Sequence, residues 1–144
     1  MAEFTSSIIL IKEIQTIEEK RLNQALKAHD ITLSQAKALS IILKHPEHQV
    51  TLKCLEKELG LAQSVTAGTI VRLEQKGYIE SFGDFADKRI KIVSITPLGE
   101  QQFQVSQKIL AEQENTILSD LSENEKQQLK ELLTKVRNTL LETN

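Results

Sequence analysis

The sequence predicts a mainly α-helical fold of the α+β class, with one small β-hairpin inserted between helices. Three observations predict it. Apolar residues recur every three or four positions over most of the chain, which is typical of amphipathic helices. Between residues 78 and 95 the apolar spacing changes to two, which is typical of strands. Finally, helix-capping signals such as Thr96-Pro97 stand where helical spacing begins.

The composition is that of one globular domain. The chain has 144 residues, of which 40% are hydrophobic and 26% charged, with a net charge of −2. Its longest apolar stretch, Ile8 to Ile11, is far shorter than the roughly 20 residues that span a bilayer, so no membrane association is predicted. Cys54 is the only cysteine, which excludes an intrachain disulfide and fits a reducing compartment. We therefore expect a cytoplasmic protein.

The first half of the chain predicts four helices. The first follows the hydroxyl-rich residues 5–7 and runs toward residue 29. The second follows Ser34 and must end near Pro46, because proline disfavours helical backbone in the preceding residue. Thr51 caps a short third helix, and a fourth begins near residue 62 or 63 and ends at Gly77. The third and fourth helices, joined by a tight glycine-containing turn, are a helix-turn-helix candidate.

The second half predicts a hairpin and two more helices. Residues 78–82 and 90–95 alternate as two strands, with Ile90, Ile92 and Ser94 on one face, and the charged stretch between them is the hairpin tip. A fifth helix starts at Thr96-Pro97, and a sixth starts at the capping box of residues 122–125. The sixth carries an apolar stripe that needs a partner chain to cover it: Leu129, Leu132, Leu133, Val136, Leu140 and Leu141.

Three motifs carry a family resemblance that covers essentially the whole chain. They are LEKELGL at residues 55–61, RLEQKGYIE at residues 72–80, and DKR followed by ITPLGE within residues 87–100. With them, the sequence resembles the MarR family of winged helix-turn-helix transcriptional regulators. The resemblance implies that residues 1–33 and 97–144 are dimerisation helices and that residues 34–96 bind double-stranded DNA. Many members of that family are repressors that small aromatic or phenolic ligands, metals or thiol oxidation release from DNA.

The hairpin tip is the most informative part of the predicted DNA-binding region. A carboxylate beside an arginine can hold the guanidinium in one pose, and a narrow minor groove attracts a positioned arginine. The resemblance implies that Arg89 enters the minor groove and that Asp87 orients it, with Lys88 and Lys91 near phosphates. The alternative is that the tip is polar only because hairpin tips are solvated.

The fourth helix is the predicted recognition helix. Its outward residues Gln63, Ala67 and Val71 favour A·T-rich DNA, because glutamine can pair with adenine and small apolar side chains can contact thymine methyl groups. Two departures from the family pattern are Ala62 in place of a serine cap and the lack of a basic residue near Gly68. Arg72 is further along the helix and is expected to contact a phosphate. The alternative is that Arg72 is solvated and forms an ion pair with Glu74 or Glu80. The predicted DNA-contacting residues are Gln63, Ser64, Thr66, Ala67, Gly68, Arg72, Asp87, Lys88, Arg89 and Lys91.

The charge distribution supports this placement weakly. Residues 34–96 hold nine basic and seven acidic residues, whereas the flanking segments hold nine basic and thirteen acidic. Positive charge is therefore concentrated in the segment that the resemblance places on DNA.

Metal, cofactor and catalytic sites are not predicted. His29, His45 and His48 read as surface histidines, and no His or Cys lies in the fifth helix, where zinc-sensing relatives have ligands. Cys54 lies in the third helix rather than near the N-terminus, where peroxide-sensing relatives have their reactive cysteine, and reads as an inert thiol. The sequence contains no glycine-rich phosphate loop and no nucleophile elbow, which argues against an enzyme.

The sequence therefore predicts a homodimeric, sequence-specific DNA-binding transcriptional regulator. We expect a ligand-responsive repressor on an A·T-rich palindromic operator, with half-sites about 34–36 Å apart. The alternative is a winged-helix module that contacts another protein instead of DNA, which the near-neutral outward face of the fourth helix keeps open.

Overall fold

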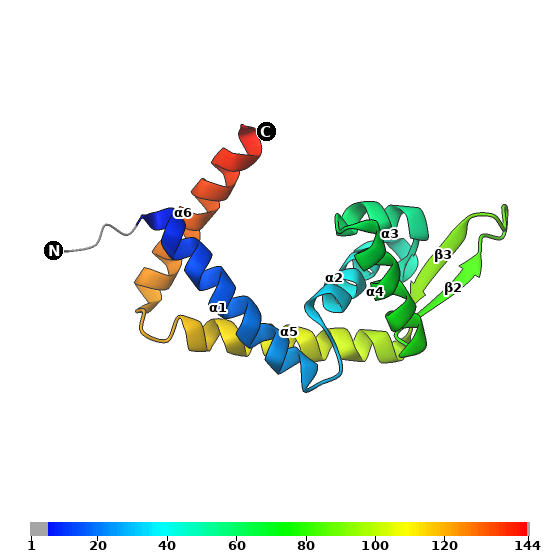
Figure 1. Ribbon diagram of the computed structural model, residues 1–144, viewed down its shortest axis with the longest axis horizontal. Coiled ribbons are helices and arrows are strands. Elements are labelled where there is room, and N and C mark those ends of the chain that lie inside the picture. The colour runs from blue at the N-terminus through cyan, green and yellow to red at the C-terminus, as the bar shows by residue number, and fades with distance from the viewer. Residues whose placement is uncertain (1–5, 144) are drawn as a thin grey trace. The chain divides into compact units, whose positions relative to one another are not determined.

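The computed structural model describes residues 6–143 and confirms the predicted fold class (Figure 1). Two compact units divide the chain between Ile109 and Leu110. The elements, in chain order, are α1 (Ser7–Lys27), α2 (Leu33–Lys44), a 3₁₀ turn (Pro46–His48), β1 (Gln49–Thr51), α3 (Leu52–Leu59), α4 (Gln63–Gln75), β2 (Ile79–Gly83), β3 (Lys91–Ile95), α5 (Pro97–Ile117) and α6 (Glu123–Glu142).

Side-chain caps begin every α-helix of the described chain except α4. The caps predicted at Thr51, Thr96 and Ser122 are present, and each hydroxyl oxygen accepts a hydrogen bond from the backbone N–H three residues later. The start of α2 differs from the prediction. It begins at Leu33, before Ser34, because Thr32 forms a reciprocal capping box with Gln35. Local hydroxyl groups therefore explain most helix starts.

The sheet has one more strand than the sequence predicted. Its order is β1-β3-β2, and both pairings are antiparallel, with Val50 of β1 opposite Val93 of β3. The buried face of β3 is formed by Val93 and Ile95. Ile90, predicted as a strand residue, lies exposed before the start of β3. The wing is therefore attached through β1 to the segment that precedes α3.

The core of the first unit is aliphatic, as expected for a chain with 3% aromatic residues. Each of the first four helices and each of the two long strands contributes a side chain that is 2% exposed or less. These side chains are, in chain order, Leu26, Leu39, Leu55, Leu73, Ile79 and Val93. The first turns of α5 also pack into this unit, through Gly99, Ser106 and Ile109. The compact unit is therefore larger than the predicted winged segment of residues 34–96.

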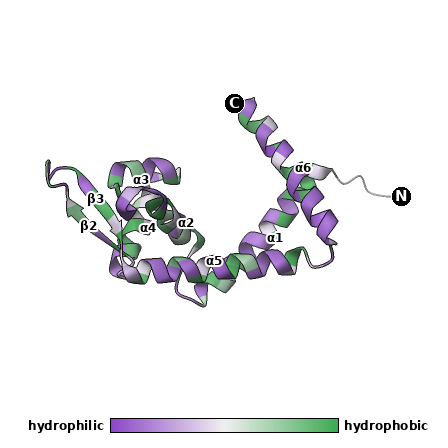
Figure 2. Cartoon of the chain, turned by 180° about the vertical axis from the view of Figure 1, so that it is seen from behind, coloured by the Kyte–Doolittle hydropathy of each residue, from purple (hydrophilic) through white to green (hydrophobic). Residues whose placement is uncertain are grey.

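Two helices expose apolar faces. In α1 the exposed residues are Ile8, Ile9, Leu10, Ile11, Ile14 and Ile17, and in α6 they are Leu132, Leu133, Val136, Leu140 and Leu141. Apolar residues alternate with hydrophilic ones along α6 (Figure 2), and the helix buries none of its residues. Such faces are typical of surfaces that another chain covers. No helix within residues 6–143 is long and apolar enough to cross a membrane.

Candidate nucleic-acid interface

The tip of the β2–β3 wing holds one arginine in a fixed pose. Arg89 donates from Nε to Oδ1 of Asp87 at 3.1 Å and from Nη2 to Oδ2 at 3.1 Å, a two-point contact. The Arg89 backbone N–H donates to the same carboxylate at 3.0 Å. The Arg89 side chain is nevertheless 91% exposed. The predicted pairing of the two residues is therefore confirmed, and the guanidinium is both oriented and accessible.

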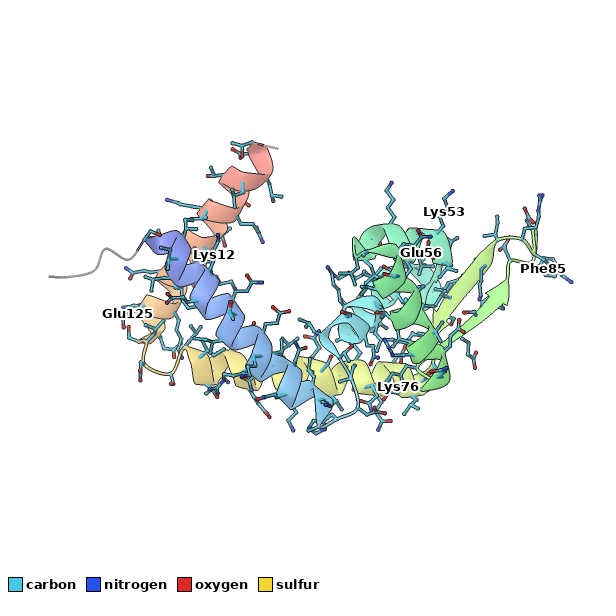
Figure 3. The ribbon with its side chains drawn as sticks, viewed as in Figure 1. Lys12, Lys53, Glu56, Lys76, Phe85 and Glu125 are labelled. Atoms are coloured by element: carbon cyan, nitrogen blue, oxygen red, sulfur yellow. The ribbon has the colours of Figure 1, made fainter. Side chains whose placement is uncertain are left out.

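The turn that carries this pair is held by its own hydrogen bonds. Asp84 accepts from the backbone N–H groups of Ala86 and Asp87 at 3.2 and 3.3 Å, and its own N–H donates to the Ile90 carbonyl at 2.8 Å. The side chain of Phe85 is fully exposed at the tip (Figure 3). Sequence reasoning gave no role to Asp84 or Phe85. The Asp-x-x-Asp spacing that builds the turn was the available signal.

The Asp87 carboxylate titrates differently because of Arg89. The side-chain hydrogen bonds from Arg89, followed by its backbone N–H, hold the pKa of Asp87 below its ordinary value of 3.8. A lowered pKa in the folded chain means that the pair persists above the unfolded pKa and is lost only as the pH falls through the folded value. The arginine is therefore held in place throughout the neutral range.

We expect carbon-detected NMR titration to place the pKa of Asp87 below 3.8 in the wild-type chain. In Arg89→Ala the pKa should rise toward 3.8 without reaching it, because the backbone hydrogen bond stays. Lys88→Ala removes the same charge from a neighbouring exposed position and should leave the titration unchanged. Equal titration curves in the wild type and Arg89→Ala would contradict the two-point contact.

Helix α4 presents a mostly uncharged outward face. Gln63, Ser64, Ala67 and Arg72 are exposed, and Val65 and Val71 are about half exposed. Within the described chain no side chain caps the first turn, whose N-cap residue is Ala62. The N–H groups at that end are therefore free to meet an acceptor such as a phosphate oxygen.

One residue of the predicted contact set is inaccessible. Thr66 is 2% exposed, and its hydroxyl has no hydrogen-bond partner among residues 6–143. It shares the buried face of α4 with Thr69, Ile70 and Leu73, which packs against α2 and α3. The prediction that Thr66 contacts DNA is therefore wrong. Gly68 is half buried, and a Cβ added there would meet only the flexible end of the Arg72 side chain.

Two grooves lie beside the exposed residues of the wing tip and of α4. The first, of about 440 Å³, lies between α3 and the wing, where Lys53, Arg89 and Lys91 outnumber the single carboxylate of Glu56. The second, of about 420 Å³, lies between α2 and α4 and is lined largely by hydroxyl groups together with Arg72. Figure 3 shows Lys53 and Glu56 on α3. Both grooves offer hydrogen-bond donors to an anionic backbone.

The alternative that the sequence left open for Arg72, an ion pair with Glu74 or Glu80, does not form among residues 6–143. Glu74 lies 4.0 Å from the Lys91 ammonium and accepts a hydrogen bond from Ser81. Arg72 is thus available to a ligand, whereas Lys91 is partly neutralised by Glu74.

Comparison with known proteins agrees with this geometry. The model of the MarR family matches residues 31–91. A curated relative, the HTH-type transcriptional regulator BilQ of Clostridium symbiosum, is 34% identical over 90 residues, which are 60% of this chain and 62% of that protein. A crystal structure of an S. aureus MepR–DNA complex is 30% identical and superimposes with a TM-score of 0.75, over 95% of this chain and 99% of MepR. The chain belongs to the MarR family.

A second DNA complex extends the likeness of this MarR-family chain. A cysteine-to-serine mutant of E. coli MarR, crystallised with operator DNA, is 26% identical and has a TM-score of 0.72 over 94% of this chain and 99% of that one. The resemblance inferred from the three motifs is confirmed. The family and the matched relatives are transcription regulators and not enzymes, in agreement with the prediction.

Proposed function

We propose that this MarR-family chain is a homodimeric transcriptional regulator that binds double-stranded DNA in a sequence-specific manner. The observation that carries the proposal is the wing tip, where an almost fully exposed guanidinium is held at two points by Asp87. An ordered arginine at the end of a protruding hairpin is suited to the minor groove, and most strongly to the narrow groove of A·T-rich DNA. Exposed Phe85 adds an apolar surface beside it.

Helix α4 would occupy the major groove. Its exposed residues include a glutamine, which can pair with adenine, and half-exposed valines, which can contact thymine methyl groups. Gln63, Ser64, Ala67, Gly68 and Arg72 remain in the proposed contact set, with Arg72 on a phosphate. The cations of the groove between α3 and the wing would contact the flanking backbone. These features favour an A·T-rich site.

A homodimer explains the exposed apolar faces. The isoleucines of α1 and the leucines of α6 lie on the predicted dimerisation segments, residues 1–33 and 97–144. A second copy can cover them through a two-fold interface, in which each residue contributes twice. Two-fold symmetry then requires a palindromic operator with half-sites about one helical turn apart.

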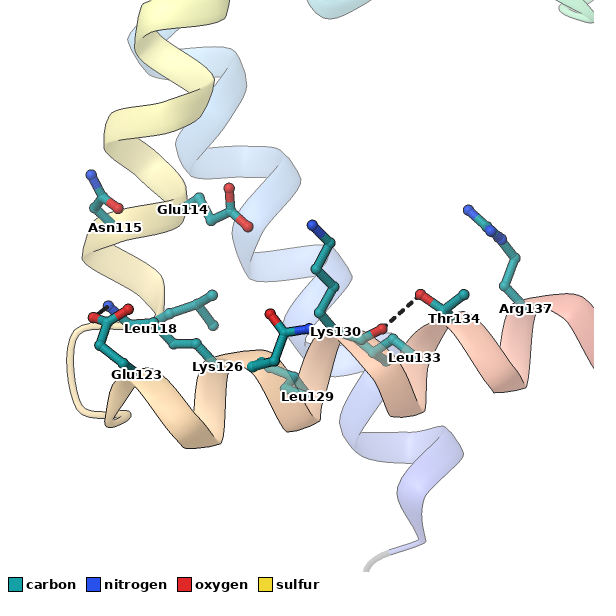
Figure 4. Close-up of a pocket in the computed structure, with 11 residues that line it drawn as sticks. Glu114, Asn115, Leu118, Glu123, Lys126, Leu129, Lys130, Leu133, Thr134 and Arg137 are labelled. Atoms are coloured by element: carbon teal, nitrogen blue, oxygen red, sulfur yellow. Dashed lines mark hydrogen bonds and ion pairs between the residues drawn. The ribbon is translucent and has the colours of Figure 1, made fainter.

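The proposal also covers the direction of regulation, which is repression, and the small molecule that controls it. We place the protein in the cytoplasm as a repressor released by a small aromatic or phenolic effector. The unit beyond Leu110 contains an open cavity of about 620 Å³ between the end of α5 and α6 (Figure 4). Its lining combines leucines with three cations, Lys126, Lys130 and Arg137, and with two carboxylates, Glu114 and Glu123, of which Glu123 pairs with Lys126 at 3.2 Å. The cations still outnumber the carboxylates, which suits an aromatic ring that carries a negative charge.

Selection on randomised duplex DNA at moderate salt tests the proposal. We expect the wild-type protein to enrich an A·T-rich palindrome. Arg89→Ala should bind the selected site about tenfold or more weakly and lose preference at the A·T positions that it reads, because a lost base-edge contact costs about 1–3 kcal/mol. Lys88→Ala is the matched control: it removes one charge and should weaken all sequences evenly, lowering the salt slope by about one.

The second candidate function is a protein-interaction module. Half-exposed Val65 and Val71 on the outward face of α4 favour it, since apolar side chains also suit a protein partner. In that case the selection would enrich no sequence, and residual DNA binding would be equally weak in the wild type and Arg89→Ala. Enrichment of a G·C-rich site would instead contradict the role assigned to Gln63 and its neighbours.

A further inference from the structure

Three potential metal ligands meet where α2 ends and α3 runs alongside it. His45 is the C-cap residue of α2, whereas Cys54 and Glu58 are four residues apart on α3 and therefore share one face of that helix. One ligand atom from each of the three lies within 4.8 Å of the other two. It is the one group of three such side chains among residues 6–143. None of the three belongs to the proposed DNA-contacting set.

We propose that His45, Cys54 and Glu58 form a binding site for a divalent transition metal, with Zn²⁺ as the best-suited ion. Imidazole nitrogen, thiolate sulfur and carboxylate oxygen are the three donor types that zinc takes from proteins. The thiolate and the carboxylate carry two negative charges, which balance the charge of the ion. Three protein ligands leave the fourth tetrahedral position to water or to an exogenous ligand.

The geometry needs only side-chain adjustment. His45 Nε2 and Glu58 Oε2 lie 2.9 Å apart, at hydrogen-bond distance. Zinc bonds of about 2.0–2.3 Å place two tetrahedral ligand atoms roughly 3.3–3.6 Å apart, so this pair would open slightly and the thiol would move closer. The side chains of His45 and Glu58 are 28% and 42% exposed, which allows both to turn. A bound cation would replace the direct contact between the imidazole and the carboxylate.

Binding would close a loop that leads to the wing. The segment between the ligands, residues 46–53, contains the 3₁₀ turn and β1, and β1 pairs with β3 of the wing. Glu47 and His48 in this segment both have left-handed backbone conformations, with φ of 61° and 54°. A metal bridge from His45 to α3 would fix both ends of this strained segment and stabilise the folded chain.

The chain contains a matched control for the proposal. His48 Nδ1 lies 3.1 Å from Glu100 Oε1, so a second histidine makes the same kind of pair with a glutamate. That pair is not part of the three-ligand group. His48→Gln therefore removes a histidine–glutamate pair without touching the proposed site, whereas Cys54→Ser, His45→Gln and Glu58→Gln each remove one ligand.

The first measurement is a cobalt titration of the reduced, metal-free, tag-free full-length chain. One equivalent of Co²⁺ per chain should produce the near-ultraviolet charge-transfer band of a cobalt–thiolate bond in the wild type and in His48→Gln. Cys54→Ser should lack the band. Absence of the band in the wild type would overturn the proposal, as would an unchanged band in Cys54→Ser.

The second measurement is zinc affinity by competition with a chromophoric chelator. Even the loss of a residue that only supports a ligand weakens metal binding about 10–100-fold, so each ligand variant should bind zinc roughly a hundredfold or more weakly than the wild type. Zinc should raise the thermal midpoint of the wild type and not that of Cys54→Ser. Equal weakening in His48→Gln and His45→Gln would show adventitious binding by surface histidines and overturn the proposal.

Discussion

Gly99→Ala is expected to destabilise the folded chain strongly, although it adds only one methyl group. Gly99 lies buried in the first turn of α5 against the loop that precedes β2. A Cβ at this position would lie 2.1 Å from the Tyr78 carbonyl oxygen and 2.8 Å from Cγ1 of Ile95. Neither atom can yield easily, because the Tyr78 carbonyl accepts the Thr96 N–H at 3.0 Å and Ile95 belongs to β3.

The expected destabilisation is about 3 kcal/mol or more, at the upper end of the cost of overpacking a core. The better helix propensity of alanine offsets only about 1 kcal/mol of it. Thermal and urea unfolding followed by circular dichroism measure the effect, and the thermal midpoint should fall by roughly 10 °C. Because the same turn joins the wing to α5, the variant should also lose its DNA affinity at a lower temperature than the wild type.

Gly68→Ala is the matched control for this prediction. It makes the same substitution inside a helix, but the nearest heavy atom to the new Cβ is Nη1 of Arg72 at 3.4 Å, at the end of a flexible side chain. Its expected effect has the opposite sign, a gain of up to about 1 kcal/mol. Equal stability changes in the two variants would show that the close approach of α5 to Tyr78 is not present in solution.

Local signals explain why much of the fold could be predicted. Thr51, Thr96-Pro97 and the Ser122 capping box each satisfy backbone N–H groups within a few residues, so their effect can be seen in the sequence itself. Gly77 likewise ends α4 at a backbone φ of 76°, which favours glycine. The pairing of Asp87 with Arg89 was predictable for the same reason, since the two residues are close neighbours in the chain.

Contacts between distant segments explain what was missed. Strand β1 has three residues, too few to show an alternating pattern, and it exists only because β3, far along the chain, pairs with it. The burial of Thr66 depends on how α4 is rotated against α2 and α3, which its own polar sequence does not reveal. His45, Cys54 and Glu58 became a candidate site only when a loop brought the end of α2 beside α3.

The double substitution Val136→Lys with Leu140→Lys is expected to convert the proposed dimer to monomers. Both residues are exposed on α6, four positions apart on its apolar stripe, with exposures of 45% and 62%. In a two-fold interface the two lysines would bring four unpaired charges into contact with apolar surface, and each buried unpaired charge costs several kcal/mol. Size-exclusion chromatography with light scattering should give the single-chain mass of 16.3 kDa in place of about twice that value.

The control places the same two charges on the other side of the same helix. Asn124 and Asn138 are exposed and lie fourteen residues apart, on the side of α6 opposite Val136 and Leu140, so Asn124→Lys with Asn138→Lys should leave the dimer mass unchanged. Because α6 buries none of its residues within the chain, neither variant has a core to disturb, and both should keep the helical circular dichroism of the wild type. A dimer that survives Val136→Lys with Leu140→Lys would exclude the α6 stripe from the interface. Dissociation confined to that variant would locate the interface on the stripe, and affinity for a palindromic site should then fall although α4 and the wing are untouched.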